Sequence, residues 1–309
     1  MVHIAIAGPG RISRRFLQGT LEAEHAEVTA FATRNPDRVK DYASEYGITK
    51  IGSFSALCSD PLIDAFYIST PNEVHVSMIR EALLNGKHVI CEKPITITHT
   101  ELQELFDLAH EKQLVLMEAH KTLYTPTFQS IRSLVQSGAL GEIYYASASF
   151  SRGEEHSEAE WRLRGKGAGA AYDVGCYGLA ALSALFPNGL SVIEDHRIPF
   201  GETDGEGFFR LEADGIPLRV NYSFLHDGDC DLVIQGEQGT LTCTSFWKSD
   251  RYLIVNPSGT NEFVFPFHSE FAFEAEQFAK RIIEGWYEDP FSEGVSLSVM
   301  KILDGTYGA

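Results

Sequence analysis

Near the start of the sequence, the segment Gly8-Pro9-Gly10-Arg11-Ile12-Ser13 has the residue types that could bind a phosphate group. It follows a short apolar run and opens an amphipathic stretch, which is the strand, turn and helix context of a dinucleotide-binding loop. The first glycine permits a tight turn, and the second lets backbone N–H groups approach a pyrophosphate at the helix N-terminus. Ser13 stands where the full pattern has a third glycine, so a glycine turn in another α/β fold is the alternative. We expect the dinucleotide contacts to include Gly8, Gly10, Arg11 and Ile12.

The residues after the second predicted strand bear on which dinucleotide is bound. An acidic residue there would hydrogen-bond the ribose 2′-hydroxyl of NAD, but this sequence has Thr33-Arg34-Asn35. A guanidinium group can pair with a 2′-phosphate and stack on the adenine. An exposed loop arginine without a ligand is the alternative. We predict that NADP(H) is favoured over NAD(H) and that Thr33 and Arg34 contact it.

Lys93 is the first candidate for catalysis. It follows a predicted strand at 88–91 and precedes Pro94. In an open parallel sheet, ligands bind in the crevice at the carboxyl ends of the strands, where Thr70 and Asn72 are also expected. An ammonium group beside a carbinol oxygen stabilises the alkoxide during hydride loss, and it equally polarises a carbonyl during reduction. A surface loop lysine is the alternative, and the peptide before Pro94 is expected from the sequence alone to be trans.

Asp173 and Tyr177 are four residues apart and follow a glycine-rich stretch at 165–169. If a helix begins near Asp173, both side chains project from one face of it toward the same cleft. A phenol with an ordinary pKa of about 10 is a poor base at neutral pH, so Tyr177 suits proton donation unless a cation such as Lys93 lowers its pKa. The alternatives are a helix N-cap for Asp173 and a packed helix-face residue for Tyr177. We predict that these two residues and Lys93 form the catalytic group.

Five further segments carry a family resemblance. They are Ser69-Thr70-Pro71-Asn72-Glu73-Val74-His75, Gly86-Lys87-His88-Val89-Ile90-Cys91-Glu92-Lys93-Pro94, Ser137-Gly138-Ala139-Leu140-Gly141-Glu142-Ile143, Trp161-Arg162 and Ala170-Ala171-Tyr172-Asp173-Val174-Gly175-Cys176-Tyr177. Because these segments occur in this order, the sequence resembles the glucose-fructose oxidoreductase, inositol dehydrogenase and rhizopine-catabolism (Gfo/Idh/MocA) family of nicotinamide-dependent oxidoreductases over nearly its whole length. Glu92-Lys93-Pro94 alone would be a chance match, but the ordered set is specific.

The resemblance implies a fold and an activity. A Rossmann domain would bind the nicotinamide cofactor, and a C-terminal domain would cover the nicotinamide and form a homodimer or homotetramer. The implied reaction is hydride transfer at a secondary alcohol, or its ketone or aldehyde, of a sugar, polyol or diol. Many relatives have histidine at the position of Tyr177, so this chain is similar to the subgroup of glucose-fructose oxidoreductase and the dimeric dihydrodiol dehydrogenases, where a tyrosine is thought to exchange the proton. In the family, the peptide before Pro94 is commonly cis.

The strand ends and the resemblance together give two sets of contacts. Further cofactor-binding residues are predicted to be Thr70, Pro71, Asn72, His75, Glu92 and Lys93. Substrate-binding residues are predicted to be Lys93, His120, Trp161, Arg162, Asp173 and Tyr177. An indole face suits a sugar ring, although Trp161 could equally belong to the core. No histidine spacing indicates a metal site, so we expect no metal.

The elements that would position these residues are predicted from hydrophobic periodicity. In the first 120 residues, strands are expected at 2–7, 27–33, 65–69, 88–91 and 114–118, and helices at 11–23, 37–46, 74–84 and 100–112. This alternation predicts βαβ units and a doubly wound parallel sheet, which is an α/β Rossmann fold.

After a helix at 126–136 the pattern changes. Strands are expected at 142–151, 207–213, 218–224, 231–235 and 240–246. They predict an α+β domain with one large, mostly antiparallel open sheet, on which a helix at 269–284 would pack. We therefore divide the chain into a Rossmann domain at 1–121 and a substrate-binding and oligomerisation domain at 122–309.

Composition excludes several functions. The chain has 43 acidic and 25 basic residues, and its net charge of -18 would repel nucleic acid. Five scattered cysteines without a CxxC pair indicate neither a disulfide framework nor a zinc ribbon, which fits a reducing cytoplasm. No signal peptide and no apolar run of about 18 residues is found, so no membrane association is expected.

Two other functions remain open at this point. A noncatalytic regulator that senses NADP or a sugar is one, since the family includes noncatalytic members. The presence of both Lys93 and Tyr177 favours an enzyme over such a sensor. A hydrolase or lyase that uses bound NAD as a transient oxidant is the other, and both Tyr177 in place of histidine and the Arg34 loop argue against it.

Overall fold

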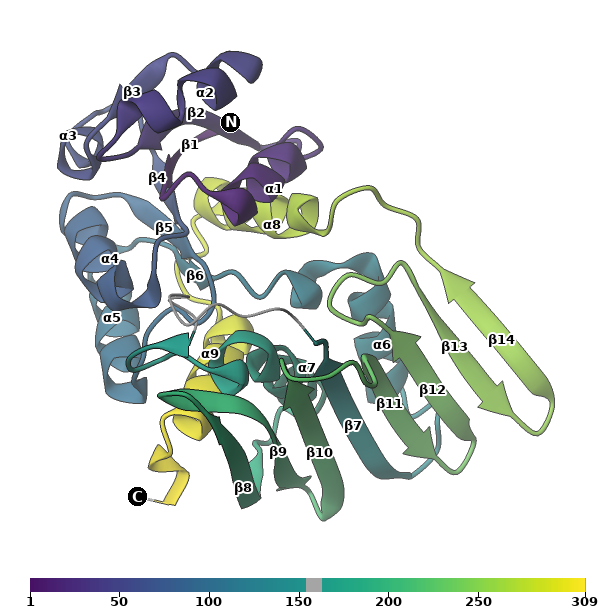
Figure 1. Ribbon diagram of the computed structural model, residues 1–309. Helices are drawn as coiled ribbons and strands as arrows, with labels where there is room; N and C mark the ends of the chain where they lie inside the picture. Colours follow the sequence, from purple (N-terminus) through teal and green to yellow (C-terminus); the bar gives the residue numbers. More distant parts are fainter. Residues whose placement is uncertain (154–162, 309) are drawn as a thin grey trace. The chain divides into compact units, whose positions relative to one another are not determined.

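The computed structural model describes residues 1–153 and 163–308 of the 309-residue chain. It divides into two compact units, each built on one β-sheet (Figure 1). The first unit contains Met1–Lys121 and Ser269–Glu293, and the second contains Thr122–His268 and Gly294–Ala309. Among the described residues, no helix has the length and apolar character needed to cross a membrane.

The first unit is built on a six-stranded parallel sheet with the order β3-β2-β1-β4-β5-β6, which confirms the predicted Rossmann sheet. Its strands are β1 (Val2–Ala7), β2 (Ala26–Ala32), β3 (Lys50–Gly52), β4 (Ala65–Ile68), β5 (His88–Cys91) and β6 (Leu116–Glu118). The central strands are apolar runs because both faces of the sheet are covered. The order reverses between β1 and β4, and sheets of this kind bind ligands at such a switch point, beyond the carboxyl ends of the strands.

The helices of the first unit follow the strands in the expected alternation. They are α1 (Arg11–Thr20), α2 (Lys40–Glu45), α3 (Phe54–Cys58), α4 (His75–Leu84), α5 (His99–Lys112) and α8 (Glu270–Glu284), with 3-10 turns at Pro36–Arg38 and Asn72–Val74. The short elements β3 and α3 were not predicted, because three and five residues are too few to show a period.

Helix α8 packs on α1 and on strands β1 and β2 (Figure 1), so the prediction that it packs on the large sheet is wrong. Its buried face includes Phe271, Ala275 and Phe278. Gly19 of α1 allows the two helices to lie close together, since a Cβ on Gly19 would lie 2.6 Å from Cβ of Phe271. The apolar spacing predicts the helix but does not specify which sheet receives it.

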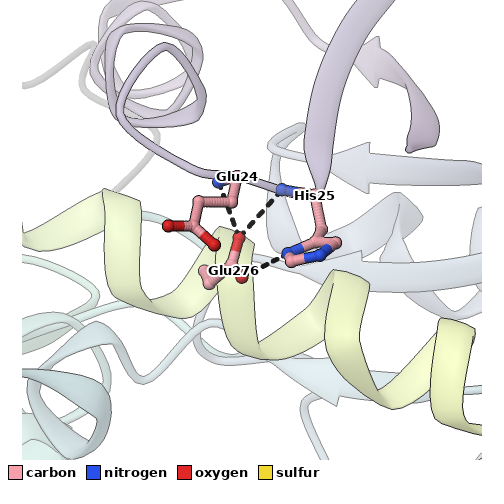
Figure 2. A group of neighbouring side chains, drawn as sticks. All are labelled: Glu24, His25 and Glu276. Carbon is pink, nitrogen blue, oxygen red and sulfur yellow. Dashed lines mark hydrogen bonds and ion pairs between the residues drawn. The ribbon is translucent and has the colours of Figure 1, made fainter.

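Glu276 of α8 ties this helix to the turn before β2 (Figure 2). Its carboxylate accepts hydrogen bonds from the backbone N–H groups of Glu24 at 2.9 Å and His25 at 3.0 Å, and it lies 2.6 Å from Nδ1 of His25. These three residues are the only group in the described part of the chain that brings three potential metal ligands together, within 4.8 Å of one another. Since both carboxylate oxygens of Glu276 already accept hydrogen bonds, the group joins a helix to a strand.

The second unit is built on an eight-stranded sheet with the order β14-β13-β12-β11-β7-β10-β9-β8. Its strands are β7 (Ile143–Ser151), β8 (Ser191–Phe200), β9 (Thr203–Ala213), β10 (Ile216–Ser223), β11 (Asp231–Gly236), β12 (Gly239–Thr244), β13 (Arg251–Asn256) and β14 (Gly259–Val264). Strands β7 and β10 are parallel and the other neighbouring pairs are antiparallel, which confirms the large, mostly antiparallel sheet.

One helix, α7 (Cys176–Leu185), covers the middle of this sheet. The remaining described helices are α6 (Pro126–Gln136) and α9 (Pro290–Leu303), with a π-helix at Ala171–Gly175 and 3-10 turns at Lys121–Tyr124 and Thr306–Gly308. Helix α7 packs on β7 and β10. A Cβ on Gly178 would lie 2.8 Å from Cγ1 of Val220, so glycine at this position lets the helix lie directly on the sheet.

Candidate active site

The glycine turn after β1 makes the close backbone approach that a dinucleotide-binding loop needs. Gly8 has a φ of +84°, in the region that favours glycine. A Cβ on Gly8 would lie 2.8 Å from the carbonyl oxygen of Ser69, which follows β4. Only glycine therefore lets the loops after β1 and β4 pass each other at the switch point. Helix α1 begins at Arg11, directly after this turn, and its first N–H groups can receive an anion.

Ser13, which replaces the third glycine of the pattern, is fully buried and closes the turn. Its Oγ accepts a hydrogen bond from the N–H group of Gly10 at 2.7 Å, and its hydroxyl group donates to the carbonyl oxygen of Gly10 at 2.9 Å. The serine is small enough for α1 to pack closely on the sheet. This departure from the pattern therefore stabilises the turn instead of blocking it.

Thr33, Arg34 and Asn35 follow β2 at the same edge of the sheet. The N–H group of Asn35 donates a hydrogen bond of 3.1 Å to Oγ1 of Thr33, which forms a local turn. Arg34 is exposed, and the structure assigns its guanidinium group no ion pair or hydrogen bond with any residue it describes. The guanidinium is thus available to a phosphate group.

Glu92 is held at the end of β5 by a buried tyrosine. The hydroxyl group of Tyr67 donates a hydrogen bond of 2.5 Å to Oε1 of Glu92, while the N–H group of Lys93 donates to Oε2 at 3.3 Å. Tyr67 is fully buried, and its ring stacks on Phe16 with 3.7 Å between the centroids. Burial raises the pKa of Tyr67 far above its ordinary value, and the charges of Glu92 and Glu274 add to this effect. Tyr67 is therefore a neutral donor that orients the carboxylate.

Lys93 is half-buried at the carboxyl end of β5. The peptide bond between Lys93 and Pro94 is cis. The expectation of a trans bond is therefore wrong, because it rested on the general preference of X-Pro bonds, which the rest of a folded chain can override. The isomer implied by the family resemblance is confirmed.

His75, at the start of α4, is completely buried between two main-chain carbonyl groups. Its Nε2 lies 2.8 Å from the oxygen of Thr70, and its Nδ1 lies 3.1 Å from the oxygen of Pro94. Burial lowers the pKa of His75, which favours the neutral ring. Since both ring nitrogens face protein carbonyl groups, any effect of His75 on a cofactor is exerted through these two loops.

His120, a predicted substrate contact, follows β6 and is buried. Its Nε2 lies 3.1 Å from Oε2 of Glu118. The other carboxylate oxygen of Glu118 accepts a hydrogen bond of 3.0 Å from the N–H group of Ile95. The pair thus joins the loops that follow β5 and β6.

A group of charged residues in the first unit, of which Lys121, Glu270 and Glu274 are buried, was not predicted. Nζ of Lys121 lies 3.4 Å from Oε1 of Glu270, and Nη2 of Arg15 lies 2.5 Å from the same oxygen. Glu274 is completely buried, and within the described chain neither of its carboxyl oxygens has a hydrogen-bond partner. Burial raises the pKa of Glu274 well above its ordinary value, and the nearby carboxylate of Glu92 adds to the rise. Residues so far apart in the sequence share no spacing from which this group could be found.

Asp173 and Tyr177 lie in the second unit, where the π-helix continues into α7 at Cys176. Both side chains are half-buried. Asp173 lies inside the helical segment, whose N-cap is Ala170, so the alternative role of Asp173 as an N-cap is wrong. Single π-helical turns are frequent at functional sites.

The ring of Tyr177 lies against two aromatic side chains of the same unit. Its centroid is 5.6 Å from that of Phe150 and 6.5 Å from that of Trp247, and those two rings stack at 3.8 Å. Phe150 belongs to β7 and Trp247 to the turn after β12, so no local pattern could have predicted this cluster. Trp161 and Arg162, predicted to line the substrate pocket, lie outside the described residues.

Asp204, also not predicted, holds the start of the π-helix. Its Oδ2 accepts a hydrogen bond of 2.8 Å from the N–H group of Ala171. A Cβ on Gly169, which has a φ of +101°, would overlap Oδ1 of Asp204, so the glycine leaves room for the carboxyl group. Burial raises the pKa of Asp204, although the hydrogen bond from Ala171 and the charge of Arg197 oppose the rise. Asp204 thus positions the segment that carries Asp173.

Two profiles of one protein family match this chain. The profile described as "Oxidoreductase family, NAD-binding Rossmann fold" matches residues 2–120, and that of the "GFO/IDH/MocA C-terminal domain" matches residues 128–242. The chain belongs to the Gfo/Idh/MocA oxidoreductase family. The predicted resemblance is thereby confirmed.

Similar members of the Gfo/Idh/MocA family cover nearly the whole chain. A trans-1,2-dihydrobenzene-1,2-diol dehydrogenase of Xenopus tropicalis is 28% identical over 97% of this chain and 95% of its own. A scyllo-inositol 2-dehydrogenase (NADP(+)) of Bacillus subtilis is 27% identical over 98% of this chain and 94% of its own. The crystal structure of a 3-ketoreductase from Actinomadura kijaniata in complex with NADP and TDP-benzene is 26% identical, has a TM-score of 0.89, and covers 98% of this chain and 96% of that one.

As a member of the Gfo/Idh/MocA family with these relatives, the chain is an NAD(P)-dependent oxidoreductase. This confirms the predicted dehydrogenase or reductase and favours it over a noncatalytic regulator.

Proposed function

We propose that the protein transfers a hydride between NADP(H) and a secondary alcohol, or the corresponding ketone or aldehyde, of a sugar, polyol or diol. The observation that carries this proposal is one edge of the parallel sheet, where the glycine turn follows β1, Arg34 follows β2 and Lys93 follows β5. The relatives described above are a diol dehydrogenase, an inositol dehydrogenase and a 3-ketoreductase, which supports this substrate class.

The residues at this edge fit a dinucleotide that carries a 2′-phosphate. The glycine turn leaves no room for a Cβ at Gly8, and the guanidinium group of Arg34 is exposed. The relative of known structure holds NADP, which supports the same cofactor here. When bound, the nicotinamide supplies or accepts the hydride. The proposed contacts are Gly8, Gly10, Arg11, Ile12, Thr33, Arg34, Thr70, Pro71, Asn72, Glu92 and Lys93.

The cofactor preference is tested by titrating cofactor-stripped protein with NADPH and with NADH while tryptophan fluorescence is followed. Arg34→Ala should weaken NADPH binding by about tenfold or more and leave NADH binding nearly unchanged, because only the 2′-phosphate loses a charged partner. Arg80→Ala, which removes an arginine paired with Glu104 at 3.2 Å, is the charge-matched control. An unchanged ratio of the two affinities in Arg34→Ala would show that the NADP assignment is wrong.

Lys93, Asp173 and Tyr177 are the proposed catalytic residues. The ammonium group of Lys93 would polarise the carbonyl oxygen, or stabilise the alkoxide oxygen in the reverse direction. The phenol of Tyr177 would give its proton to that oxygen during reduction. Asp173 would support the tyrosine from the same helical segment. The π-helix at Ala171–Gly175 supports this assignment, since such turns are frequent at functional sites.

Turnover measurements on a panel of sugars, polyols and diols test the catalytic group. Lys93→Met and Tyr177→Phe should each lower kcat by about 100-fold or more, because each removes a group that contacts the reacting oxygen. Tyr144→Phe, at a position that is 54% exposed, is the matched control for the loss of a phenol. If both Lys93→Met and Tyr177→Phe retain turnover, the catalytic assignment is wrong. His120, Trp161 and Arg162 remain proposed substrate contacts.

The second sheet is the proposed oligomerisation surface. Along β13, Tyr252 and Ile254 are buried, whereas Leu253 and Val255 are 38% and 50% exposed. This alternation leaves one face of the strand open with apolar side chains on it. If a homodimer or homotetramer forms through this face, Val255→Asp should dissociate it. Light scattering should then give the molar mass of a monomer for this variant. An unchanged mass in that variant would exclude this strand from the interface.

A further inference from the structure

His75 lies where the loops after β4 and β5 meet. Its imidazole ring is completely buried, with Nε2 at 2.8 Å from the oxygen of Thr70 and Nδ1 at 3.1 Å from the oxygen of Pro94. Thr70 begins the segment that is proposed to contact the cofactor, and Pro94 directly follows Lys93. One ring therefore spans the cofactor loop and the loop that carries the proposed catalytic lysine.

A neutral ring cannot donate a hydrogen bond to both carbonyl groups. A neutral imidazole carries one N–H group, whereas a carbonyl oxygen can only accept a hydrogen bond. Burial lowers the pKa of His75, although backbone hydrogen bonds with Thr70, Pro94 and Ile95 and the nearby carboxylate of Glu92 oppose this effect. One contact is then a hydrogen bond and the other is a close polar contact without a proton. The two loops are thus coupled through one buried side chain.

Lys93 lies between two residues that are each held by a buried side chain. On its amino side, Tyr67 holds the carboxylate of Glu92 at 2.5 Å. On its carboxyl side, His75 contacts the carbonyl oxygen of Pro94 at 3.1 Å. The side chain before the lysine and the backbone after it are therefore both held from the interior of the first unit.

We propose that His75 is a positioning residue for Lys93. Through Pro94 it fixes the backbone that follows the lysine, and through Thr70 it sets this backbone relative to the cofactor loop. The inference rests on the proposed function, because it takes Lys93 as the residue that contacts the substrate oxygen. Displacement of a catalytic group by about 1 Å can cost about 100-fold in rate, so a contact of this kind is relevant to turnover.

Three substitutions separate the two contacts of the ring. His75→Asn places an amide nitrogen near the position of Nδ1 and can keep the contact with Pro94. His75→Gln reaches the position of Nε2 and can keep the contact with Thr70. His75→Leu keeps a similar volume and removes both polar contacts.

The proposal predicts a crossed pattern in these variants. His75→Gln should lower kcat by about tenfold or more while the Kd for NADPH stays near that of the wild type, because Pro94 and hence Lys93 are released. His75→Asn should keep kcat at saturating cofactor but weaken NADPH binding, and His75→Leu should lose both. In the cofactor-free protein, hydrogen exchange of the amides at 92–97 should be faster in the Gln and Leu variants only.

His88→Asn is the matched control. His88 lies at the amino end of β5, and its Nδ1 accepts a hydrogen bond of 2.9 Å from the N–H group of Val115. Asparagine can keep this acceptor, so kcat and the Kd for NADPH should stay unchanged.

Two results would overturn the inference. The first is that kcat, the Kd for NADPH and the exchange rates stay at wild-type values in all His75 variants. The second is that His75→Asn and His75→Gln lose kcat and affinity equally, which would indicate a general structural role. If His75→Leu does not fold, the Asn and Gln pair still decides the matter. Retained turnover in Lys93→Met would instead contradict the proposed function itself, whatever the His75 variants do.

Discussion

The hydroxyl group of Tyr67 donates a hydrogen bond of 2.5 Å to Oε1 of Glu92, the neighbour of Lys93. Tyr67 belongs to β4 and Glu92 follows β5, so the bond joins two adjacent parallel strands at their carboxyl ends. Because the tyrosine ring is fully buried and stacked on Phe16, the donor has a fixed position. The carboxylate is thus oriented from the interior of the sheet.

Tyr67→Phe should lower the free energy of unfolding by about 1.5–3 kcal/mol, because a hydrogen bond to a charged acceptor is lost while the stacked ring is kept. Urea denaturation followed by circular dichroism measures this. Tyr252→Phe is the control, since it removes a bond of 2.9 Å to the neutral hydroxyl group of Ser130 and should cost only about 0.5–1.5 kcal/mol. Equal losses in the free energy of unfolding would contradict the conclusion that the hydrogen-bond partner of Tyr67 is charged.

Gly8→Ala should abolish most cofactor binding, because the new Cβ would lie 2.8 Å from the carbonyl oxygen of Ser69 and push the loops after β1 and β4 apart. Gly47→Ala is the matched control. Gly47 also has a positive φ, +67°, but its Cβ would meet no atom within 4 Å, so only the backbone cost of about 1 kcal/mol is expected. Fluorescence titration with NADPH checks both variants, and similar affinities in the two would disprove the steric argument.

Glu274→Gln should become more stable relative to the wild type as the pH rises. The pKa of Glu274 in the folded state is raised above its ordinary value of 4.5, so the unfolded chain loses this proton first. The stability contributed by the protonated carboxyl group is complete below the unfolded pKa and is lost as the pH rises through the folded pKa. Urea denaturation at about pH 5 and about pH 8 should therefore show a growing difference between variant and wild type.

Glu276→Gln, on the same helix, provides a control of opposite sign. Partial burial acts to raise the pKa of Glu276, but hydrogen bonds from His25, Lys280 and backbone amides outweigh it and lower the pKa below 4.5. This carboxylate contributes stability above the unfolded pKa that is lost as the pH falls through the folded pKa. The glutamine variant should thus be less stable than the wild type at about pH 8 and approach it in acid. A parallel pH response in the two variants would contradict both assignments.

Asp204→Ala should lower both stability and kcat. The substitution leaves the buried N–H group of Ala171 without its acceptor, which costs about 1–3 kcal/mol, and it releases the start of the π-helix that carries Asp173. Asp204→Asn keeps an oxygen acceptor at the same position and should retain most of both properties. Thermal unfolding and kcat measured together check this. Equal effects of Ala and Asn would show that the acceptor oxygen is not what matters.

Much of the first unit could be predicted from the sequence because its signals are local. Parallel strands that are covered on both faces, such as β4 and β5, are continuous apolar runs, and their ends carry the ligand-binding residues. The glycine turn and Lys93 were found for this reason. In the second unit, strands β8, β13 and β14 were not predicted. All six residues of β14 are exposed, so no apolar alternation marks it.

The residues that hold the site in place could not be predicted, since they act through contacts between distant parts of the chain. Tyr67 reads as an ordinary buried strand residue, and nothing near Glu274 in the sequence indicates that it lies close to Glu92. The helix that carries Glu274 was predicted correctly but was assigned to the other sheet. Its amphipathic pattern indicates which face of the helix is buried, but not which sheet that face packs on.

Residues 122–268 separate α8 from the rest of the first unit along the chain. During synthesis on the ribosome, the parallel sheet therefore emerges long before the helix that covers α1, β1 and β2. The surface that receives Phe271, Ala275 and Phe278 stays open to water until that helix has been made. The first unit thus completes its core only after most of the second unit has been translated, so the two units cannot simply fold one after the other.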